Sequence, residues 1–255
     1  MKSFFITEQN VAEYADKMAA WIREKVERAR GSGVVLGMSG GLDCSVVARL
    51  CQLGGVDVHL VMMPCGDDMK NSRSGDHSME LIEKFNFSHH VFDIKPAVDA
   101  LSIAADLPFC ESAAADAGMS LANIRPRARM TYLYQLAQRT RRLVIGTSNL
   151  AERTVGYFTK WGDGASDLNP LAMLVKWEVY ALARHLDVPE SIIGKKPSAG
   201  LWDGQTDEDE LGMSYAQIDA YLVDGASGNP DIDRKIEALM AATEHKRLPI
   251  PVFEG

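Results

Sequence analysis

GVVLGMSGGLDCSVVARL, residues 33–50, is the stretch of sequence that decides the fold. The apolar run at 33–38 predicts a buried strand, and the apolar spacing at 43–53 predicts a helix. The glycine turn SGG lies between them. A strand, a glycine turn and a helix in this order form a cradle for a phosphate group, because the first amides of the helix point at the anion. We therefore predict a phosphate-binding loop at 39–45.

The residues of the loop SGGLDCS indicate how it would bind. Gly40 and Gly41 let backbone N–H groups converge without obstruction by a Cβ atom, and Ser39 and Ser45 add hydroxyl donors. The loop differs from GxxxxGK[ST], because it has no terminal lysine and carries Asp43 instead. A carboxylate beside phosphates is repelled unless a divalent ion lies between them, which indicates Mg²⁺ bridging Asp43 and a pyrophosphate. An ordinary Gly-Gly turn with Asp43 at a helix start is the alternative for this segment taken alone.

Strand and helix patterns alternate along the rest of the chain. Buried strands are predicted where apolar residues run together, at 58–63, 143–145 and, more weakly, 91–94. Helices are predicted where apolar residues recur at helical spacing, at 10–30, 76–86, 120–140 and 176–187. The alternation predicts an α/β fold with a doubly wound, mainly parallel sheet and helices on both faces. Ligands are then expected at the carboxyl ends of the strands.

Shorter signals mark helix starts and loops. Asn10 and the glutamate three residues later predict a capping box for the first helix. Thr206 predicts an N-cap, and the acidic residues 207–210 suit the first turn of that helix without any catalytic role. Two turn-rich segments, 66–76 and 194–209, predict mobile loops that serve as lids or binding segments, or else are ordinary surface insertions.

Composition narrows the class of protein. With 255 residues, of which 46% are hydrophobic and 24% charged, the chain can bury one large core. The net charge of −8 argues against nucleic-acid binding. No long apolar run or secretory signal is visible, so we expect no membrane association and a cytoplasmic location. The four cysteines show neither CxxC spacing nor partner histidines, so we expect reduced thiols.

The loop resembles the SGGxDS pyrophosphate loop of the adenine-nucleotide α-hydrolase-like ATP pyrophosphatases, with Cys44 in place of the final serine. Enzymes of that group split ATP into AMP and pyrophosphate. Five further segments resemble the ammonia-dependent NAD synthetase family: NIRPRARM (123–130), GTSNLAE (146–152), GYFTKWGDGASDLNP (156–170), PSAGLWDGQTDEDELG (197–212) and EHKRLPIP (244–251). Pro126 stands where the family has alanine, and it predicts a helix start because proline is tolerated in a first turn.

The resemblance assigns roles to residues in these segments. By the resemblance, the ATP-binding residues are Ser39, Gly40, Gly41, Leu42, Asp43, Cys44, Ser45, Thr147, Lys176 and Ser198. Those that would bind deamido-NAD are Arg127, Lys160, Asp167, His245 and Lys246. Asp43 and Glu152 would bind Mg²⁺.

Two residues are candidates for catalytic roles. Lys176 opens a predicted helix, where the helix dipole disfavours a cation, and this favours a functional charge. It would neutralise charge at the α-phosphate of ATP as pyrophosphate leaves. We hypothesise that Asp163 helps to deprotonate incoming ammonium, because only neutral ammonia has a lone pair to attack with.

The resemblance implies ATP-dependent amidation of deamido-NAD (nicotinic acid adenine dinucleotide) by ammonia through an acyl-adenylate, giving NAD, AMP and pyrophosphate. It also implies a homodimer and a single NAD synthetase domain over 1–255, without the amidase domain of glutamine-using relatives. Two alternatives stay open: a non-catalytic adenine-nucleotide sensor, suggested by Cys44, and another amidating ATP pyrophosphatase. A tRNA-thiolating enzyme is disfavoured, because paired catalytic cysteines and a basic RNA-binding face are not visible.

Overall fold

Four parallel strands form the sheet at the centre of the computed structural model, which describes residues 5–66, 73–103, 117–196 and 206–253. The strands lie in the order β3-β2-β1-β4 and are β1 (Val34–Gly37), β2 (Val58–Met62), β3 (Ser88–Val91) and β4 (Leu143–Val144). Because β1 pairs with both β2 and β4, the loop that follows β1 lies at the carboxyl edge between two neighbouring strands. The predicted parallel sheet is confirmed.

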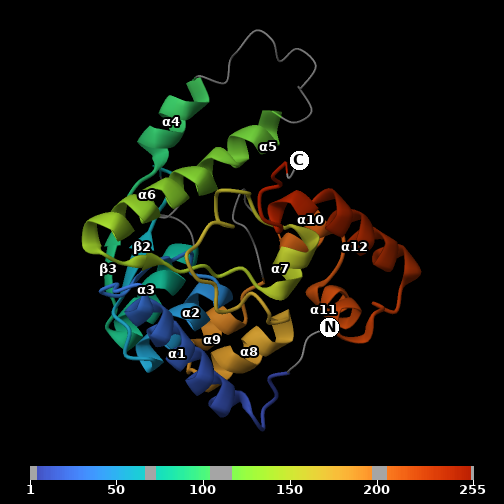
Figure 1. Ribbon diagram of the computed structural model, residues 1–255, viewed down its shortest axis with the longest axis horizontal. Helices are drawn as coiled ribbons and strands as arrows, with labels where there is room; N and C mark the ends of the chain where they lie inside the picture. Colours follow the sequence, from blue (N-terminus) through green and yellow to red (C-terminus); the bar gives the residue numbers. More distant parts are fainter. Residues whose placement is uncertain (1–4, 67–72, 104–116, 197–205, 254–255) are drawn as a thin grey trace.

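Helices cover both faces of the sheet (Figure 1). Val34 and Leu36 of β1 face one helical layer, whereas Val35 faces the other, as the two-residue period of a strand requires. The first layer contains α1 (Val11–Arg28), α2 (Leu42–Leu53), α3 (Arg73–Phe85), α8 (Lys176–His185) and α9 (Glu190–Ile193). The opposite layer contains α4 (Lys95–Ile103) and α6 (Ile124–Thr140). The central strands β1 and β2 are therefore buried on both sides.

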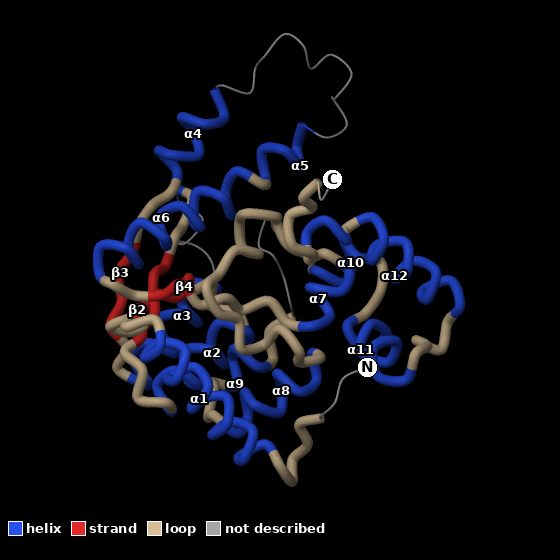
Figure 2. Tube along the Cα trace, in the orientation of Figure 1, coloured by secondary structure: helices blue, strands red, loops and turns tan. Residues whose placement is uncertain are grey.

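A second hydrophobic cluster lies beside the sheet, among helices from the second half of the chain (Figure 2). Its helices are α7 (Leu150–Val155), α10 (Asp207–Leu211), α11 (Tyr215–Asp224) and α12 (Pro230–Ala242). The remaining described helices are α5 (Ala117–Ala122) and the 3₁₀ helix η2 (Glu244–Lys246). Because α11 packs on both α7 and α8, residues of the C-terminal quarter lie close to the helices that follow β1 and β4.

Two local predictions from the sequence are wrong, the position of one strand and the capping box of the first helix. β3 precedes the predicted 91–94, because Ser88–Val91 is an edge strand whose mostly exposed residues show no apolar run. Ile94 is buried just beyond it, which explains the misleading signal. The predicted capping box at Asn10 is wrong: its side chain accepts from the Thr7 amide and donates to the Phe5 carbonyl, outside the helix.

Three other local predictions can be compared with the structure. The predicted helix at 120–140 is divided, since α5 ends at Ala122 and α6 begins at Ile124, so Pro126 does lie in a first turn. Within the described part of the chain, no helix is both long and apolar enough to cross a membrane. Cys44, Cys51 and Cys65 are buried free thiols, and Cys110 lies outside the described residues.

Candidate functional site

The loop between β1 and α2 has the shape expected of an anion cradle. Gly40 has φ of 69°, in the left-handed region where a side chain is strained, and this conformation turns the chain into the helix. Gly41 is the N-cap of α2, which begins at Leu42. The first amides of a helix have no carbonyl one turn back, so those of α2 are available to a phosphate beside the positive end of the helix dipole.

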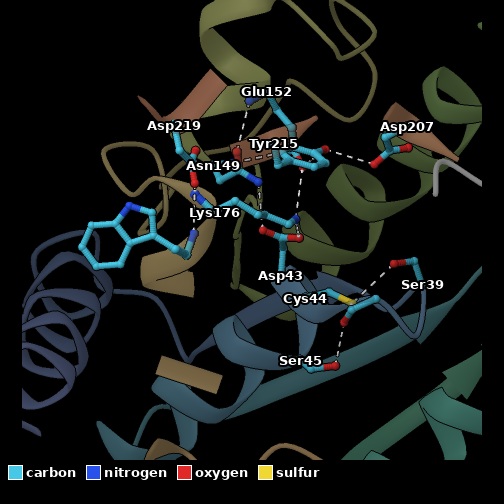
Figure 3. A network of polar contacts seen from close by, with 12 residues as sticks. Ser39, Asp43, Cys44, Ser45, Asn149, Glu152, Lys176, Asp207, Tyr215 and Asp219 are labelled. Atoms are coloured by element: carbon cyan, nitrogen blue, oxygen red, sulfur yellow. Dashed lines mark hydrogen bonds and ion pairs between the residues drawn. The ribbon is translucent and has the colours of Figure 1, made fainter. Parts of the chain in front are cut away.

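Three charged side chains meet beside this loop, from α2, α7 and α8 (Figure 3). The Lys176 Nζ lies 2.6 Å from Asp43 Oδ2 and 3.8 Å from Glu152 Oε1. The Lys176 side chain is only 4% exposed, so its charge is balanced almost entirely by these two carboxylates. The structure therefore brings the predicted metal ligands and the predicted catalytic lysine together.

The burial of this cluster shifts its ionisation. Burial, then repulsion from Asp43, raises the pKa of the Glu152 carboxyl above its ordinary value. Burial lowers the pKa of the Lys176 ammonium, but attraction to Asp43 and Glu152 outweighs it and the net pKa is raised. Lys176 is therefore charged throughout the neutral range and supplies a fixed positive charge at the start of α2.

Lys176 occupies the first residue of α8, as predicted, and a long-range contact stabilises this helix end. The backbone amides of Lys176 and Trp177 each donate to a carboxylate oxygen of Asp219, at 3.1 Å. Asp219 comes from α11, so a negative charge from a distant helix caps α8 and complements its dipole. The sequence analysis missed Asp219, because no local pattern links it to residue 176.

Asn149 is a second residue that the sequence analysis missed. Its side-chain amide donates to Asp43 Oδ1 at 3.0 Å, and its side-chain oxygen accepts the Glu152 amide at 3.1 Å. The Glu152 carboxylate in turn accepts the Asn149 amide, which completes a capping box for α7. The pattern Asn-Leu-Ala-Glu at 149–152 is the usual signature of such a box and could have revealed it.

The remaining loop residues serve the turn in different ways. Ser39 is exposed at the mouth of the loop, and its Oγ lies 3.4 Å from the Cys44 Sγ. The Cys44 thiol and the Ser45 hydroxyl donate to the Gly41 carbonyl, at 3.2 and 2.7 Å. Ser45 is fully buried, so in this arrangement its hydroxyl supports the turn instead of facing the loop mouth.

The other ATP-binding candidates include Leu42 and Thr147. The Leu42 side chain is buried in the main core, so its backbone alone is available to a ligand. Thr147 is partly exposed in the segment between β4 and α7, two residues before Asn149. Ser198 lies outside the described residues.

Three candidates for binding the dinucleotide gather at a separate exposed place. The Lys160 Nζ donates to the His245 carbonyl at 2.6 Å, and the Arg127 Nε donates to the Lys160 carbonyl at 3.4 Å. These residues come from α6, from the loop after α7 and from η2. Trp161 lies beside them with 56% of its surface exposed. A cationic group with an exposed indole suits an anionic aromatic ligand.

The other candidates of this group hold the backbone of the surrounding loops. The Lys246 Nζ donates to the carbonyls of Gly156 and Phe158, at 2.8 and 2.9 Å. Asp167 Oδ2 accepts the Val144 amide at 2.7 Å, at the end of β4. Both side chains are thus engaged in shaping the loop between α7 and α8, whatever ligand they also contact.

Asp163 closes the turn GDG. Its Oδ1 accepts the Thr159 amide at 2.9 Å. The surrounding chain desolvates the Asp163 carboxyl and raises its pKa, whereas hydrogen bonds and the attraction of Lys246 oppose the rise. A raised pKa brings a carboxylate nearer to the strength that a general base needs at neutral pH.

The donor set beside the loop fits a magnesium ion of the substrate-bridging kind. Within the described residues no group of three or more histidine, cysteine or acidic side chains could hold a metal alone. Mg²⁺ is commonly held by one or two carboxylates together with substrate phosphates and water. Asp43, in the first turn of α2, and Glu152, which shares the partners Lys176 and Asn149 with it, supply two such carboxylates.

Comparisons with known proteins identify the family of the chain. A family model described as NAD synthase matches residues 14–249. The chain belongs to the NAD synthase family. A curated family member, the NH3-dependent NAD+ synthetase of Syntrophomonas wolfei, is 41% identical over 233 residues, which cover 91% of this chain and 92% of the relative.

Solved structures of the NAD synthase family share the fold. The structure of an NMN synthetase from Francisella tularensis superimposes with a TM-score of 0.89 at 36% identity and covers 98% of this chain and all of that one. The NH3-dependent NAD synthetase of Campylobacter jejuni, solved with a nitrate ion, gives a TM-score of 0.76 at 29% identity, with coverage of 98% and 100%. The predicted family and fold class are thereby confirmed.

Proposed function

We propose that this chain is a ligase that joins ammonia to the nicotinate carboxylate of deamido-NAD and uses ATP as co-substrate. The observation that carries this function is the buried cluster of Asp43, Glu152 and Lys176 at the start of α2, in a chain similar over 91% of its length to an NH3-dependent NAD+ synthetase. A non-catalytic sensor would need no buried lysine poised between two carboxylates beside a phosphate loop.

The proposed reaction has two steps. A carboxylate oxygen of the nicotinate attacks the α-phosphorus of ATP, and the bond to the departing pyrophosphate breaks. Ammonia then attacks the carbonyl carbon of the acyl-adenylate and AMP leaves, which gives the amide. The substrate supplies its own nucleophile, so the protein has to position the two reactants and exclude water from the acyl-adenylate.

The charges of the site suit the first step. Negative charge develops on the pyrophosphate as its bond to the α-phosphorus breaks, and Lys176 with the amides of α2 would stabilise that charge. Asp43 and Glu152 would hold Mg²⁺, which when bound neutralises phosphate charge. Asn149 orients both carboxylates toward one place. The exposed group of Arg127, Lys160 and His245 would hold the nicotinate nucleotide, and Asp163 would accept a proton from ammonium.

Nicotinate mononucleotide is a second candidate acceptor. The structure with a TM-score of 0.89 is described as an NMN synthetase. NMN carries the same nicotinamide amide as NAD but lacks the AMP half, so amidation of nicotinate mononucleotide would leave the chemistry at the carboxylate unchanged. The two acceptors differ only in whether the protein also has to hold an adenylate.

One product assay separates the candidate functions. Purified protein with ATP and Mg²⁺ is given deamido-NAD or nicotinate mononucleotide, with ammonium or glutamine, and the amide, AMP and pyrophosphate are measured together. We expect equal amounts of all three with ammonium and deamido-NAD. A higher kcat/KM with the mononucleotide would favour the second candidate, and ATP binding without pyrophosphate release would favour the sensor.

Three further properties are proposed on the family resemblance: a homodimer, a single domain over 1–255 and a cytoplasmic location. Sedimentation tests the first directly. At micromolar concentration we expect a particle with twice the mass of the 28.0 kDa chain. A particle with the mass of one chain would refute the homodimer.

A further inference from the structure

A buried tyrosine–aspartate pair lies directly behind the charged cluster (Figure 3). Tyr215, at the start of α11, is 5% exposed, and Asp207, at the start of α10, is 6% exposed. The Tyr215 hydroxyl donates to Asp207 Oδ2 at 3.0 Å and also lies 3.4 Å from Glu152 Oε1. The acidic residues 207–210 were expected only to begin a helix, yet the first of them is buried against the site.

The aromatic ring of Tyr215 faces the catalytic lysine. The Lys176 Nζ lies 4.8 Å from the centroid of the ring, within the range of a cation–π contact. Figure 3 shows the ring between Asp207 on one side and Glu152 and Lys176 on the other. One side chain thus touches two of the three charged groups, the carboxylate through its hydroxyl and the ammonium through its face.

The pair is itself held firmly. The Tyr157 hydroxyl donates to Glu210 at 2.8 Å and lies 3.2 Å from Asp207 Oδ1, so its one proton is shared between the two carboxylates. The Tyr215 amide donates to Glu208 Oε1 at 2.8 Å. Because Tyr215 is fixed at both its backbone and its hydroxyl, its ring cannot turn away from Lys176 without breaking a buried hydrogen bond.

We propose that Tyr215, oriented by Asp207, is a positioning residue that holds the Glu152 carboxylate and the Lys176 ammonium where ATP cleavage needs them. The inference rests on the proposed ligase function. Reactive groups displaced by a fraction of an ångström lose much of their effect, so a tyrosine that touches no reacting atom still controls the rate. The binding of the nicotinate nucleotide, by residues elsewhere, is left unchanged.

Tyr215→Phe tests the proposal with little disturbance of packing, because it removes one oxygen and keeps the ring. We expect kcat for amide formation to fall on the order of tenfold, with the KM for the nicotinate nucleotide unchanged. Tyr221→Phe is the matched control: Tyr221 lies on the same helix and its hydroxyl donates to Glu237 at 3.2 Å, away from the site. Its activity should equal that of the unmodified protein.

Asp207→Asn and the double variant complete a cycle. If Tyr215 acts through Asp207, the double variant should lose no more than about threefold beyond the larger single loss, because one contact is removed in both cases. Thermal unfolding of each variant shows how much is folded, and kcat is expressed per folded molecule.

The outcomes separate failure of the positioning role from failure of the proposed function. A Tyr215→Phe variant as active as Tyr221→Phe, or losses that multiply in the double variant, would overturn the positioning role. A rise in the KM for the nicotinate nucleotide with kcat unchanged would overturn it as well. If the unmodified protein forms no amide from either acceptor, the proposed function fails instead.

Discussion

Replacement of Lys176 by methionine tests the electrostatic balance of the site. The change keeps the apolar stem and removes a 4% exposed ammonium that lies 2.6 Å from Asp43 and 3.8 Å from Glu152. Breaking a buried ion pair costs about 3–5 kcal/mol, because a charge is left without its partner. Asp43 is 18% exposed and keeps its hydrogen bond from Asn149, so the lower end, about 3 kcal/mol, is expected.

Thermal unfolding without nucleotide or metal measures this cost. For a chain of this size about 3 kcal/mol corresponds to a decrease in Tm of roughly 6–12 °C. The double variant Lys176→Met with Asp43→Asn should recover part of that decrease, because it removes the carboxylate nearest to the lost cation. Amide formation should fall on the order of 10²–10³-fold in the single variant and should not recover in the double.

Two results would refute this reasoning. If Lys176→Met unfolds within about 1 kcal/mol of the unmodified protein, the three charges do not depend on one another as the distances indicate. If the double variant is less stable than the single one, the lost stability comes from packing and not from an unbalanced charge.

Asn149→Ala should lower the free energy of unfolding in urea by about 1–2 kcal/mol, because it removes the cap of α7 and a hydrogen bond to Asp43. It should also raise the Mg²⁺ concentration needed for half-maximal activity, and an unchanged Mg²⁺ requirement would contradict the orienting role. Burial lowers the pKa values of His59 and His90 in the folded protein, and a neighbouring histidine adds to the effect, His90 for His59 and His89 for His90. As the pH falls, these histidines therefore become protonated in the unfolded chain before they do in the folded one. Stability should therefore be complete above the ordinary pKa of about 6.5 and fall as the pH drops below it, and His90→Gln should flatten this dependence of Tm on pH. Asp163→Asn should lower turnover most at low pH, where ammonium must lose a proton before attack; equal turnover at every pH would remove that role.

The apolar pattern of the sequence was enough to predict the central strands. The runs at 33–38 and 58–63 are buried on both faces, and such strands show continuous apolar residues. β3 was predicted three residues late, because its outer edge has no partner strand and its serine and histidines carry no burial signal. Local patterns predict buried elements well and edge elements poorly.

The site was predictable only in its separate pieces. The resemblance selected Asp43, Glu152 and Lys176, and the fold brings them within one hydrogen-bonded cluster. The residues that orient them lie far away in the sequence: Asn149 is 106 positions from Asp43, and Asp219 is 43 positions from Lys176. A hydrogen bond of that span leaves no periodic trace in the sequence, since only the tertiary fold creates it.

The cap that Asp219 provides for α8 comes from a residue that is synthesised after the helix itself. The β-strands and the phosphate loop leave the ribosome early, whereas the carboxylate that anchors the first turn of α8 follows Lys176 by 43 residues. A nascent chain that has emerged only through α8 therefore has the phosphate loop but lacks the carboxylate that caps the backbone at Lys176. Under the proposed function, we expect ATP cleavage only once α11 has been made and has docked against the first turn of α8.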